Sequence, residues 1–203
     1  YKLKNYFKDK TFISIQNGYR FYKEDFFEVL KKRKIKSLSC DYIFCFNESI
    51  ARYYKKYIKC RTIVIGSIKN NAVKIKNKKK RICLFISSFG VSKLEVEKIL
   101  IPLLVNFCNK QSLKLYVLAR RASKIEEKFY QSINKKIIFL KRSKKSSKSY
   151  KAIDSASIVI SLNNTLGYES LSRLNKTVFL NLNDRKINCK SYKMFAWPKN
   201  LKN

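Results

Sequence analysis

The chain has 203 residues, of which 47 are Lys or Arg and 13 are Asp or Glu, so its formal net charge at pH 7 is +34. Hydrophobic residues make up 45% of the sequence and aromatic residues 14%, which is too apolar for a disordered basic tail. The sequence contains no His. A Ser-His-Asp or Cys-His nucleophile, a zinc site with His ligands and imidazole acid–base catalysis are therefore excluded for these residues.

Short β-branched and aromatic runs alternate with amphipathic stretches of helical length along almost the whole chain. This alternation predicts an α/β fold in which helices cover both faces of mostly parallel strands. The predicted strands are residues 11–16, 42–46, 62–65, 81–86, 113–118, 137–140, 157–162 and 177–182. The predicted helices are residues 23–34, 49–58, 93–109, 124–134, 147–155 and 166–174.

A basic stretch at residues 69–81 interrupts the alternation, because it is polar and lacks clear periodicity. We interpret it as the junction between two α/β units. Residues 1–71 are then the C-terminal part of an N-terminal Rossmann-like domain, and residues 72–80 are a basic linker. Residues 81–203 form a second Rossmann-like domain, either complete or truncated at its end. Since the first residue is Tyr1 and few strands precede the linker, we expect a fragment of a longer protein.

The positive charge allows two interpretations. Clustered Lys and Arg are typical of proteins that bind nucleic acids or anionic membranes. Alternatively, a genome rich in A and T gives this composition without selection for binding, since Lys, Asn, Ile, Phe and Tyr make up about half of the chain. Arg, which binds phosphate in a bidentate manner, supplies only ten of the 47 cationic residues. We therefore favour compositional drift, and nucleic acid is not the expected partner.

The six cysteines show no CxxC motif and no metal-ligand spacing, and Cys45 and Cys83 lie inside apolar runs. We expect free thiols in the core, a reducing cytoplasmic compartment, and neither a metal nor a cofactor. No apolar run approaches the roughly 18 residues that span a bilayer. Membrane contact, if present, is expected to be peripheral, between basic residues and an anionic inner surface.

Ligands of an open parallel sheet bind at the carboxyl ends of its strands, where loops lead into helix N-termini. After the predicted strand 157–162, Asn164 and Thr165 can cap a helix that starts near Leu166. Gly167 allows close approach of a ligand, and Glu169 points back from the first turn toward the same opening. The carboxylate can accept hydrogen bonds from ribose hydroxyls while the amides of residues 165–167 hold a diphosphate. An ordinary capping arrangement explains the same residues.

Three further strand ends carry polar residues. Ser87 and Ser88 resemble a phosphate-cradling turn, although the segment is neither GxGxxG nor a P-loop. Arg120 is the favoured phosphate ligand of the LARR segment at residues 118–121. A polar cluster after the first predicted strand comprises Gln16, Asn17 and Arg20.

Taken together, these segments resemble bacterial surface-carbohydrate biosynthesis proteins of the GT-B glycosyltransferase type. The resemblance rests on IQNGYR (15–20), DYIFCFNESIARYYKKYI (41–58), VIGSIKNN (64–71), SLNNTLGYESLSRLNKTVFLN (161–181) and FAWP (195–198). Such proteins have two Rossmann-like domains, with the donor bound mainly by the second. The resemblance therefore implies an enzyme that transfers sugar from a nucleotide sugar to a glycan or lipid-linked acceptor, without a metal.

The resemblance also implies roles for individual residues. Donor binding falls to Thr165, Leu166, Gly167 and Glu169, with Asn164, Ser87, Ser88 and Arg120 beside them. The acceptor side of the inter-domain cleft falls to Gln16, Asn17, Arg20 and Glu48. No catalytic base is identified: Glu48 and Asp41 are the candidates, and Glu48 can equally be a carboxylate that stabilises a helix start.

Two alternatives stay open. A nucleotide-sugar epimerase of the two-domain type shares this architecture and a turn of small residues followed by Glu, but the missing His and acidic cluster make it weaker. A basic nucleic-acid-binding module would use the Lys-rich linker and loop, but no RNA- or DNA-recognition motif supports it.

Overall fold

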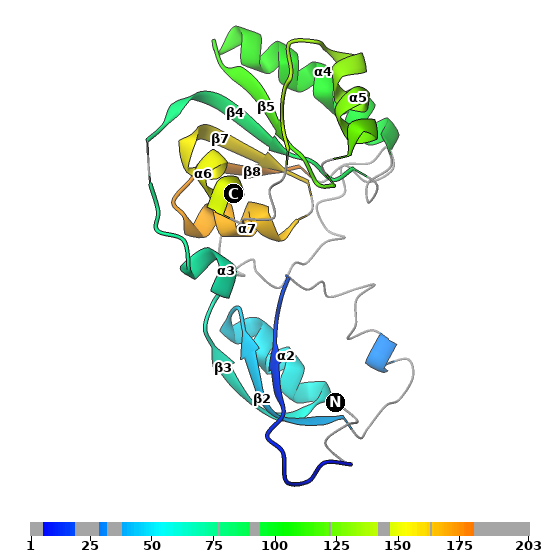
Figure 1. The fold of residues 1–203 in the computed structure, drawn as a ribbon, viewed down its shortest axis with the longest axis vertical. Helices are drawn as coiled ribbons and strands as arrows, with labels where there is room; N and C mark the ends of the chain where they lie inside the picture. The colour runs from blue at the N-terminus through cyan, green and yellow to red at the C-terminus, as the bar shows by residue number, and fades with distance from the viewer. Residues whose placement is uncertain are drawn as a thin grey trace. The chain divides into compact units, whose positions relative to one another are not determined.

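The computed structural model describes residues 6–18, 29–31, 38–76, 78–89, 94–121, 123–141, 147–162 and 164–180. The chain divides into two compact units, with the boundary between Asn71 and Ala72. Each unit contains its own sheet of parallel strands, shown as arrows in Figure 1. The predicted fold class, α/β with two Rossmann-like units of parallel sheet, is confirmed.

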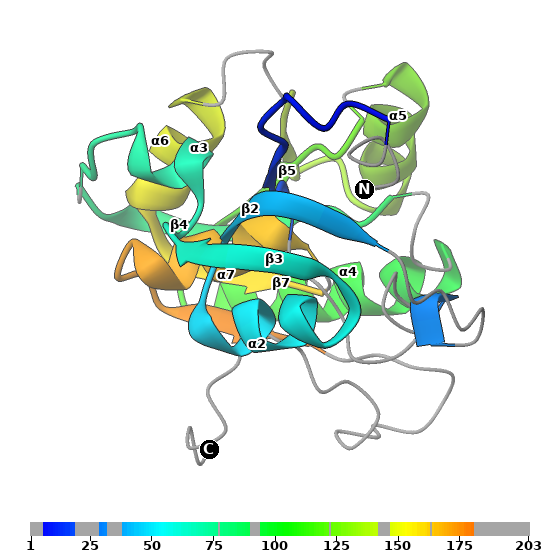
Figure 2. The same ribbon diagram turned by 90° about the horizontal axis from the view of Figure 1, so that it is seen from below.

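The first unit has, among the described residues, a sheet of three parallel strands in the order β1-β2-β3. Helix α2 packs along this sheet, as Figure 2 shows beneath β2 and β3. Buried side chains of β2 and α2, among them Ile43, Cys45, Ile50 and Tyr54, form the core. The elements are β1 Ile13–Ile15, β2 Ser39–Cys45, α2 Glu48–Tyr57, β3 Lys59–Val64 and α3 Ile68–Asn71.

The second unit has five described strands in the order β6-β5-β4-β7-β8, all parallel. Its strands are β4 Lys80–Ile86, β5 Lys114–Leu118, β6 Ile138–Leu140, β7 Ala156–Ser161 and β8 Thr177–Phe179. Its helices are α4 Leu94–Lys110, α5 Lys124–Ile133, α6 Ser147–Ser155 and α7 Thr165–Ser172. This order corresponds to 3-2-1-4-5, the first five strands of a Rossmann fold, in which the chain returns to the middle of the sheet after the third strand.

The central strand β4 explains why two layers of helices are needed. Its residues Ile82 to Ile86 are all buried, with Cys83 and Phe85 in one core cluster and Leu84 in the other. Helices α4 and α5 cover the first face and α6 and α7 the second, as Figure 1 shows. A strand buried on both faces reads as a continuous apolar run, here ICLFI.

Most predicted elements lie within a few residues of the observed ones. The first predicted strand, 11–16, is shorter in the structure, and the helix predicted at 23–34 lies mostly outside the described residues. The sequence did not predict α3, because its four residues are too few for a periodic pattern. Cys45 and Cys83 are fully buried free thiols, as the apolar runs around them predict.

Gly167 is the position where α7 touches the sheet most closely. A Cβ atom there would lie 2.6 Å from Ser161 Cβ of β7 and 2.9 Å from Phe179 Cε1 of β8. Both distances are shorter than carbon atoms tolerate. The absence of a side chain at Gly167 therefore allows the first turn of α7 to pack on the ends of β7 and β8.

We expect Gly167→Ala to lower the free energy of unfolding by about 1–3 kcal/mol, the usual cost of overpacking. Chemical denaturation of the full chain measures this change. Adding Ser161→Gly removes the Ser161 side chain and should restore part of the loss. The control Ser172→Ala, at an exposed position of the same helix, should change the stability by less than about 0.5 kcal/mol. Unaltered stability of Gly167→Ala would contradict the close packing.

Candidate functional site

The carboxyl ends of three neighbouring strands lie level at one edge of the second sheet. Ile86 at the end of β4 pairs with Leu118 of β5 on one side and Ser161 of β7 on the other. The strand order reverses between β4 and β7, since β5 and β6 lie on one side of β4 and β7 and β8 on the other. Ligands of open α/β sheets bind at such a switch point.

Helix α7 starts at this switch point. The Asn164 Oδ1 atom caps the helix by accepting a hydrogen bond of 2.9 Å from the Gly167 amide. The first amides of a helix have no carbonyl partner within it, and the aligned peptide dipoles place about half a positive charge at this end. Asn164 Nδ2 is buried and, within the described part of the chain, has no hydrogen-bond partner. The helix dipole and the buried Asn164 Nδ2 group together favour an anion at the helix start.

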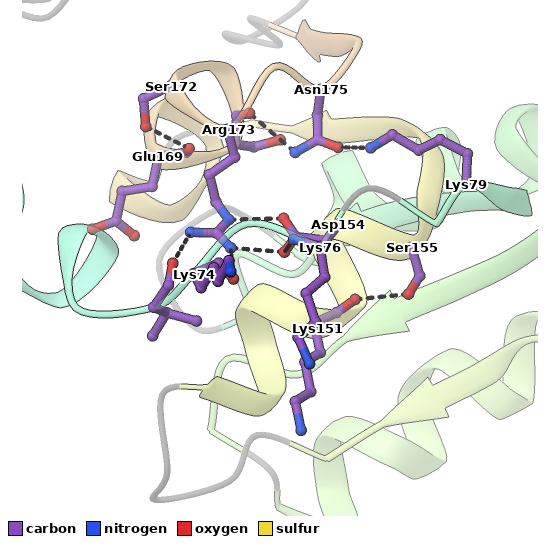
Figure 3. Close-up of polar contacts among 12 residues, drawn as sticks. Lys74, Lys76, Lys79, Lys151, Asp154, Ser155, Glu169, Ser172, Arg173 and Asn175 are labelled. Atoms are coloured by element: carbon purple, nitrogen blue, oxygen red, sulfur yellow. Dashed lines mark hydrogen bonds and ion pairs between the residues drawn. The ribbon is translucent and has the colours of Figure 1, made fainter.

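Glu169 lies one turn further along α7 and is 8% exposed. Its Oε2 atom accepts a hydrogen bond of 3.0 Å from the hydroxyl of Tyr150 in α6. Figure 3 shows the Glu169 side chain directed away from the Arg173 guanidinium on the same helix. Leu166 is half-buried and packs in part on the core cluster that contains Leu84, and Gly167 is buried against β7. Donor binding by these two residues stays a prediction.

On the other side of the switch point, Ser87 and Ser88 already bind buried carboxylates. Ser87 Oγ donates to Glu126 at 2.7 Å, and the Ser88 amide donates to Glu97 at 3.2 Å. The Tyr130 hydroxyl lies within hydrogen-bond distance of both Ser87 and Glu97. Burial, with the adjacent Glu97 charge, raises the Tyr130 pKa far above its ordinary value. Binding of the nucleotide-sugar donor by Ser87 and Ser88 stays a prediction. The carboxylates of Glu126 and Glu97 lie next to these two serines.

Arg120 joins the loops that follow β4 and β5. Its amide donates to Glu126 at 2.8 Å, and its guanidinium Nη1 donates to the Phe89 carbonyl at 3.0 Å. A guanidinium carries five N–H donors, so this contact leaves capacity for a phosphate. Arg120 is half-buried whereas Arg121 is exposed, and phosphate binding by Arg120 stays a prediction.

Residues 73–76 of the basic stretch belong to the second unit, and their backbone is hydrogen-bonded to a buried ion pair. Arg173 at the end of α7 forms two hydrogen bonds to Asp154 of α6, at 2.8 and 2.7 Å, and both side chains are at most 2% exposed. Arg173 also donates to the carbonyls of Val73 and Lys74, at 3.0 and 3.3 Å. The Lys76 amide donates to Asp154 at 3.0 Å. Figure 3 shows the pair between this segment and the two helices.

The surroundings of Asp154 shift its acidity. Burial alone would raise the pKa of this carboxyl, but the hydrogen bonds from Arg173 and Lys76 and the positive charges of Arg173 and Lys79 outweigh it. The net effect lowers the pKa of Asp154 below its ordinary value. The carboxylate therefore stays charged and compensates the buried guanidinium at neutral pH.

The remaining predicted site residues belong to the first unit. Gln16 is buried and bridges two loops, since its Oε1 accepts from the Phe46 amide at 2.9 Å and its Nε2 donates to the Gly18 carbonyl at 2.7 Å. Asn17 and Glu48 are exposed, and Glu48 occupies the first turn of α2. Arg20 lies outside the described residues. The acceptor-side role of these residues stays a prediction.

The described residues contain neither a membrane-spanning helix nor a cluster of metal ligands. Within that part of the chain, no helix is long and apolar enough to cross a membrane. No group of three or more Cys, Asp or Glu side chains there could hold a metal ion. Peripheral membrane contact stays a prediction.

Comparison with known families identifies the chain. A family model described as "putative O-antigen biosynthesis protein" matches residues 13–96 and 94–203, which is nearly the whole sequence. The chain belongs to this family. The predicted resemblance to surface-carbohydrate biosynthesis proteins is confirmed at this level. No curated protein is significantly similar to the chain in sequence.

Two solved structures resemble the chain distantly. One is the glycosylation-associated Gap123 complex of Streptococcus agalactiae, with a TM-score of 0.49 and 12% identity over 71% of this chain and 33% of that one. The other is the pneumococcal O-GlcNAc transferase GtfA in complex with UDP and GlcNAc, with a TM-score of 0.49 and 11% identity over 90% of this chain and 40% of that one. The O-antigen family chain thus spans less than half the length of either protein.

The sequence analysis did not identify Tyr150, Asp154 or Arg173 as site residues. Tyr150 and Asp154 are four residues apart on α6, and Glu169 and Arg173 are four apart on α7. This spacing places each pair on one helix face. The spacing of four residues could therefore have been recognised within each helix from the sequence. Nothing in the sequence indicates, however, that these faces of the two helices contact each other.

Replacing one partner of the buried ion pair should be costly. Asp154→Asn leaves the Arg173 guanidinium buried without a counter-charge, so we expect the free energy of unfolding at pH 7 to fall by about 3–5 kcal/mol. The matched control is Glu127→Gln, because Glu127 forms an ion pair of 3.1 Å with exposed Lys141. Such pairs contribute about 0–1 kcal/mol. If Asp154→Asn lowers the free energy of unfolding by less than about 1 kcal/mol, the ion pair does not stabilise the fold as proposed.

The same pair predicts a pH dependence. Since the folded pKa of Asp154 is lowered, its stabilisation is fully present above the unfolded value of about 3.9 and is lost as the pH falls through the folded pKa. Wild type should therefore lose stability below about pH 4 more steeply than Asp154→Asn. Denaturation curves between pH 7 and pH 2 measure both slopes, and parallel slopes would contradict this assignment.

Proposed function

We propose that this O-antigen biosynthesis protein acts as a glycosyltransferase whose second unit binds the nucleotide-sugar donor at the start of α7. One observation carries the proposal: a helix capped by Asn164 begins at the switch point, and Glu169 is buried one turn later. The first feature suits a diphosphate and the second suits ribose hydroxyls. Family membership supplies the biosynthetic context.

The chemistry of transfer explains why these groups are suited to the task. The bond between the sugar anomeric carbon and the diphosphate oxygen breaks, and the nucleoside diphosphate leaves with the bonding electrons. A new bond forms to an acceptor hydroxyl oxygen, whose proton passes to a base. Hydrogen-bond donors that point at the leaving diphosphate stabilise the charge that develops on it. No described residue is assigned as the base.

In this proposal the diphosphate lies against the first-turn amides of α7, with Asn164 Nδ2 as an additional donor. A helix N-terminus binds phosphate through its amides and its dipole together. Arg120, on the opposite side of the switch point, supplies a cation. The buried carboxylates Glu97 and Glu126 beneath the end of β4 disfavour an anion there. We therefore place the diphosphate nearer α7 than Ser87 and Ser88.

A thermal-shift panel tests donor binding. UDP, ADP, GDP and dTDP are each added to the full chain, and UDP is included because GtfA is described in complex with it. We expect one or more to raise the unfolding midpoint, since a ligand at 100 times its Kd stabilises by about 2.7 kcal/mol. The matching nucleosides, which lack the diphosphate, should have little effect. No shift with any diphosphate would contradict the proposal.

Glu169→Gln tests the ribose contact in the same assay. We expect it to remove most of the nucleotide-dependent shift, because a carboxylate accepts both ribose hydroxyls and an amide has only one acceptor oxygen. Glu127→Gln, a carboxylate on the surface of the same unit, is the matched control and should keep the full shift. An undiminished shift in folded Glu169→Gln would contradict the assigned role. Conversion of a free nucleotide sugar without an acceptor would favour the epimerase alternative.

A further inference from the structure

Tyr150 is the residue that contacts the Glu169 carboxylate from the neighbouring helix. It lies in α6, is 2% exposed, and donates its hydroxyl hydrogen to Glu169 Oε2 at 3.0 Å. A tyrosine hydroxyl has a single hydrogen to donate. The contact is buried on both sides, where hydrogen bonds are stronger than in water.

The ring of Tyr150 is held in place from two directions. The Arg173 guanidinium lies over it, with the central carbon 4.9 Å from the ring centroid. Arg173 is itself fixed by two hydrogen bonds to Asp154 and by the carbonyls of residues 73 and 74. Tyr150 also belongs to the core cluster that contains Leu84 and Ile153. Its hydroxyl is therefore a donor at a fixed position.

The two contacts between the helices form a regular set. Tyr150 bonds to Glu169 and Asp154 bonds to Arg173, each pair separated by 19 residues. The members of each helix are four residues apart and therefore share one face. The register between α6 and α7 that the ion pair fixes also brings Tyr150 opposite Glu169.

We propose that Tyr150 is a positioning residue for nucleotide binding: its hydroxyl orients the Glu169 carboxylate toward the ribose hydroxyls and thereby confers selectivity for them. This rests on the proposed function, in which Glu169 binds ribose. A free glutamate side chain rotates about its terminal bond, whereas one held oxygen fixes the plane of the carboxylate. A carboxylate accepts about four hydrogen bonds, so the bond from Tyr150 leaves capacity for ribose.

The test compares two ligands in the full chain. The ribonucleoside diphosphate that binds most tightly among UDP, ADP and GDP is titrated beside its 2′,3′-dideoxy analogue. In wild type we expect the analogue to bind at least about tenfold more weakly. Tyr150→Phe keeps the ring beneath Arg173, and should bind the parent nucleotide about five- to tenfold more weakly through loss of one hydrogen bond. Its affinity for the dideoxy analogue should equal that of wild type.

Two features of the data separate positioning from a merely structural role. A structural role would weaken both ligands equally, whereas positioning weakens only the one with ribose hydroxyls. Because Tyr150 acts through Glu169, Tyr150→Phe with Glu169→Gln should bind no more weakly than Glu169→Gln alone. The matched control is Tyr116→Phe, a half-buried tyrosine of the same cluster, which should retain wild-type affinity for both ligands.

Failure of this inference differs from failure of the proposed function. If Glu169→Gln loses selectivity for ribose hydroxyls but Tyr150→Phe retains it, the role of Tyr150 is wrong and donor binding by Glu169 stands. If the parent nucleotide and its dideoxy analogue bind with equal affinity, both to wild type and to Glu169→Gln, the ribose role of Glu169 is wrong. Equal weakening of both ligands in Tyr150→Phe also overturns the positioning role, and binding of the dideoxy analogue shows that the variant is folded.

Discussion

The buried ion pair between Asp154 and Arg173 is the constraint on which the proposed site depends. It joins α6, α7 and residues 73–76, three segments that are distant in the sequence. Two charges taken out of water are costly to bury, and their attraction offsets that cost only when the remaining donors and acceptors are also bonded. Here the backbone of residues 73, 74 and 76 provides those bonds. The pair therefore fixes one arrangement of the three segments.

This arrangement affects how the basic stretch is understood. The polar, Lys-rich composition of the stretch and its lack of clear periodicity predict a basic linker at residues 72–80. In the structure, the backbone of residues 73, 74 and 76 is hydrogen-bonded to Arg173 and Asp154 of the same unit, ahead of strand β4, which starts at Lys80. A segment can thus be rich in Lys and still be fixed, because its backbone rather than its charge makes the contacts.

The two sides of the switch point differ in their polar chemistry. Beneath the end of β4, buried Glu97 and Glu126 accept hydrogen bonds from the serine and arginine loops, so carboxylates lie close to that side. At the start of α7, the helix dipole and the buried Asn164 Nδ2 donor favour an acceptor instead. An anionic ligand complements the second side. This asymmetry is the physical basis for placing the diphosphate against α7.

Local features were predictable from the sequence, whereas long-range partners were not. The strands and α7 follow from apolar periodicity, and Asn164 follows from its position before a helical segment. Glu126 stands three residues after Ser123, a capping pattern that could have been noticed. By contrast, Arg173 is one of 47 cationic residues, and nothing near it in sequence distinguishes it from a solvated one. Its role depends on Asp154, which only the packing of α6 on α7 brings close.

The most direct test of the account is a crystal structure of the full chain with the nucleoside diphosphate that binds most tightly. We predict density for the diphosphate against the first turn of α7, with the ribose hydroxyls within hydrogen-bond distance of Glu169 and Tyr150 still bonded to that carboxylate. Density with the diphosphate at the end of β4 and the ribose away from Glu169 would contradict the central claim.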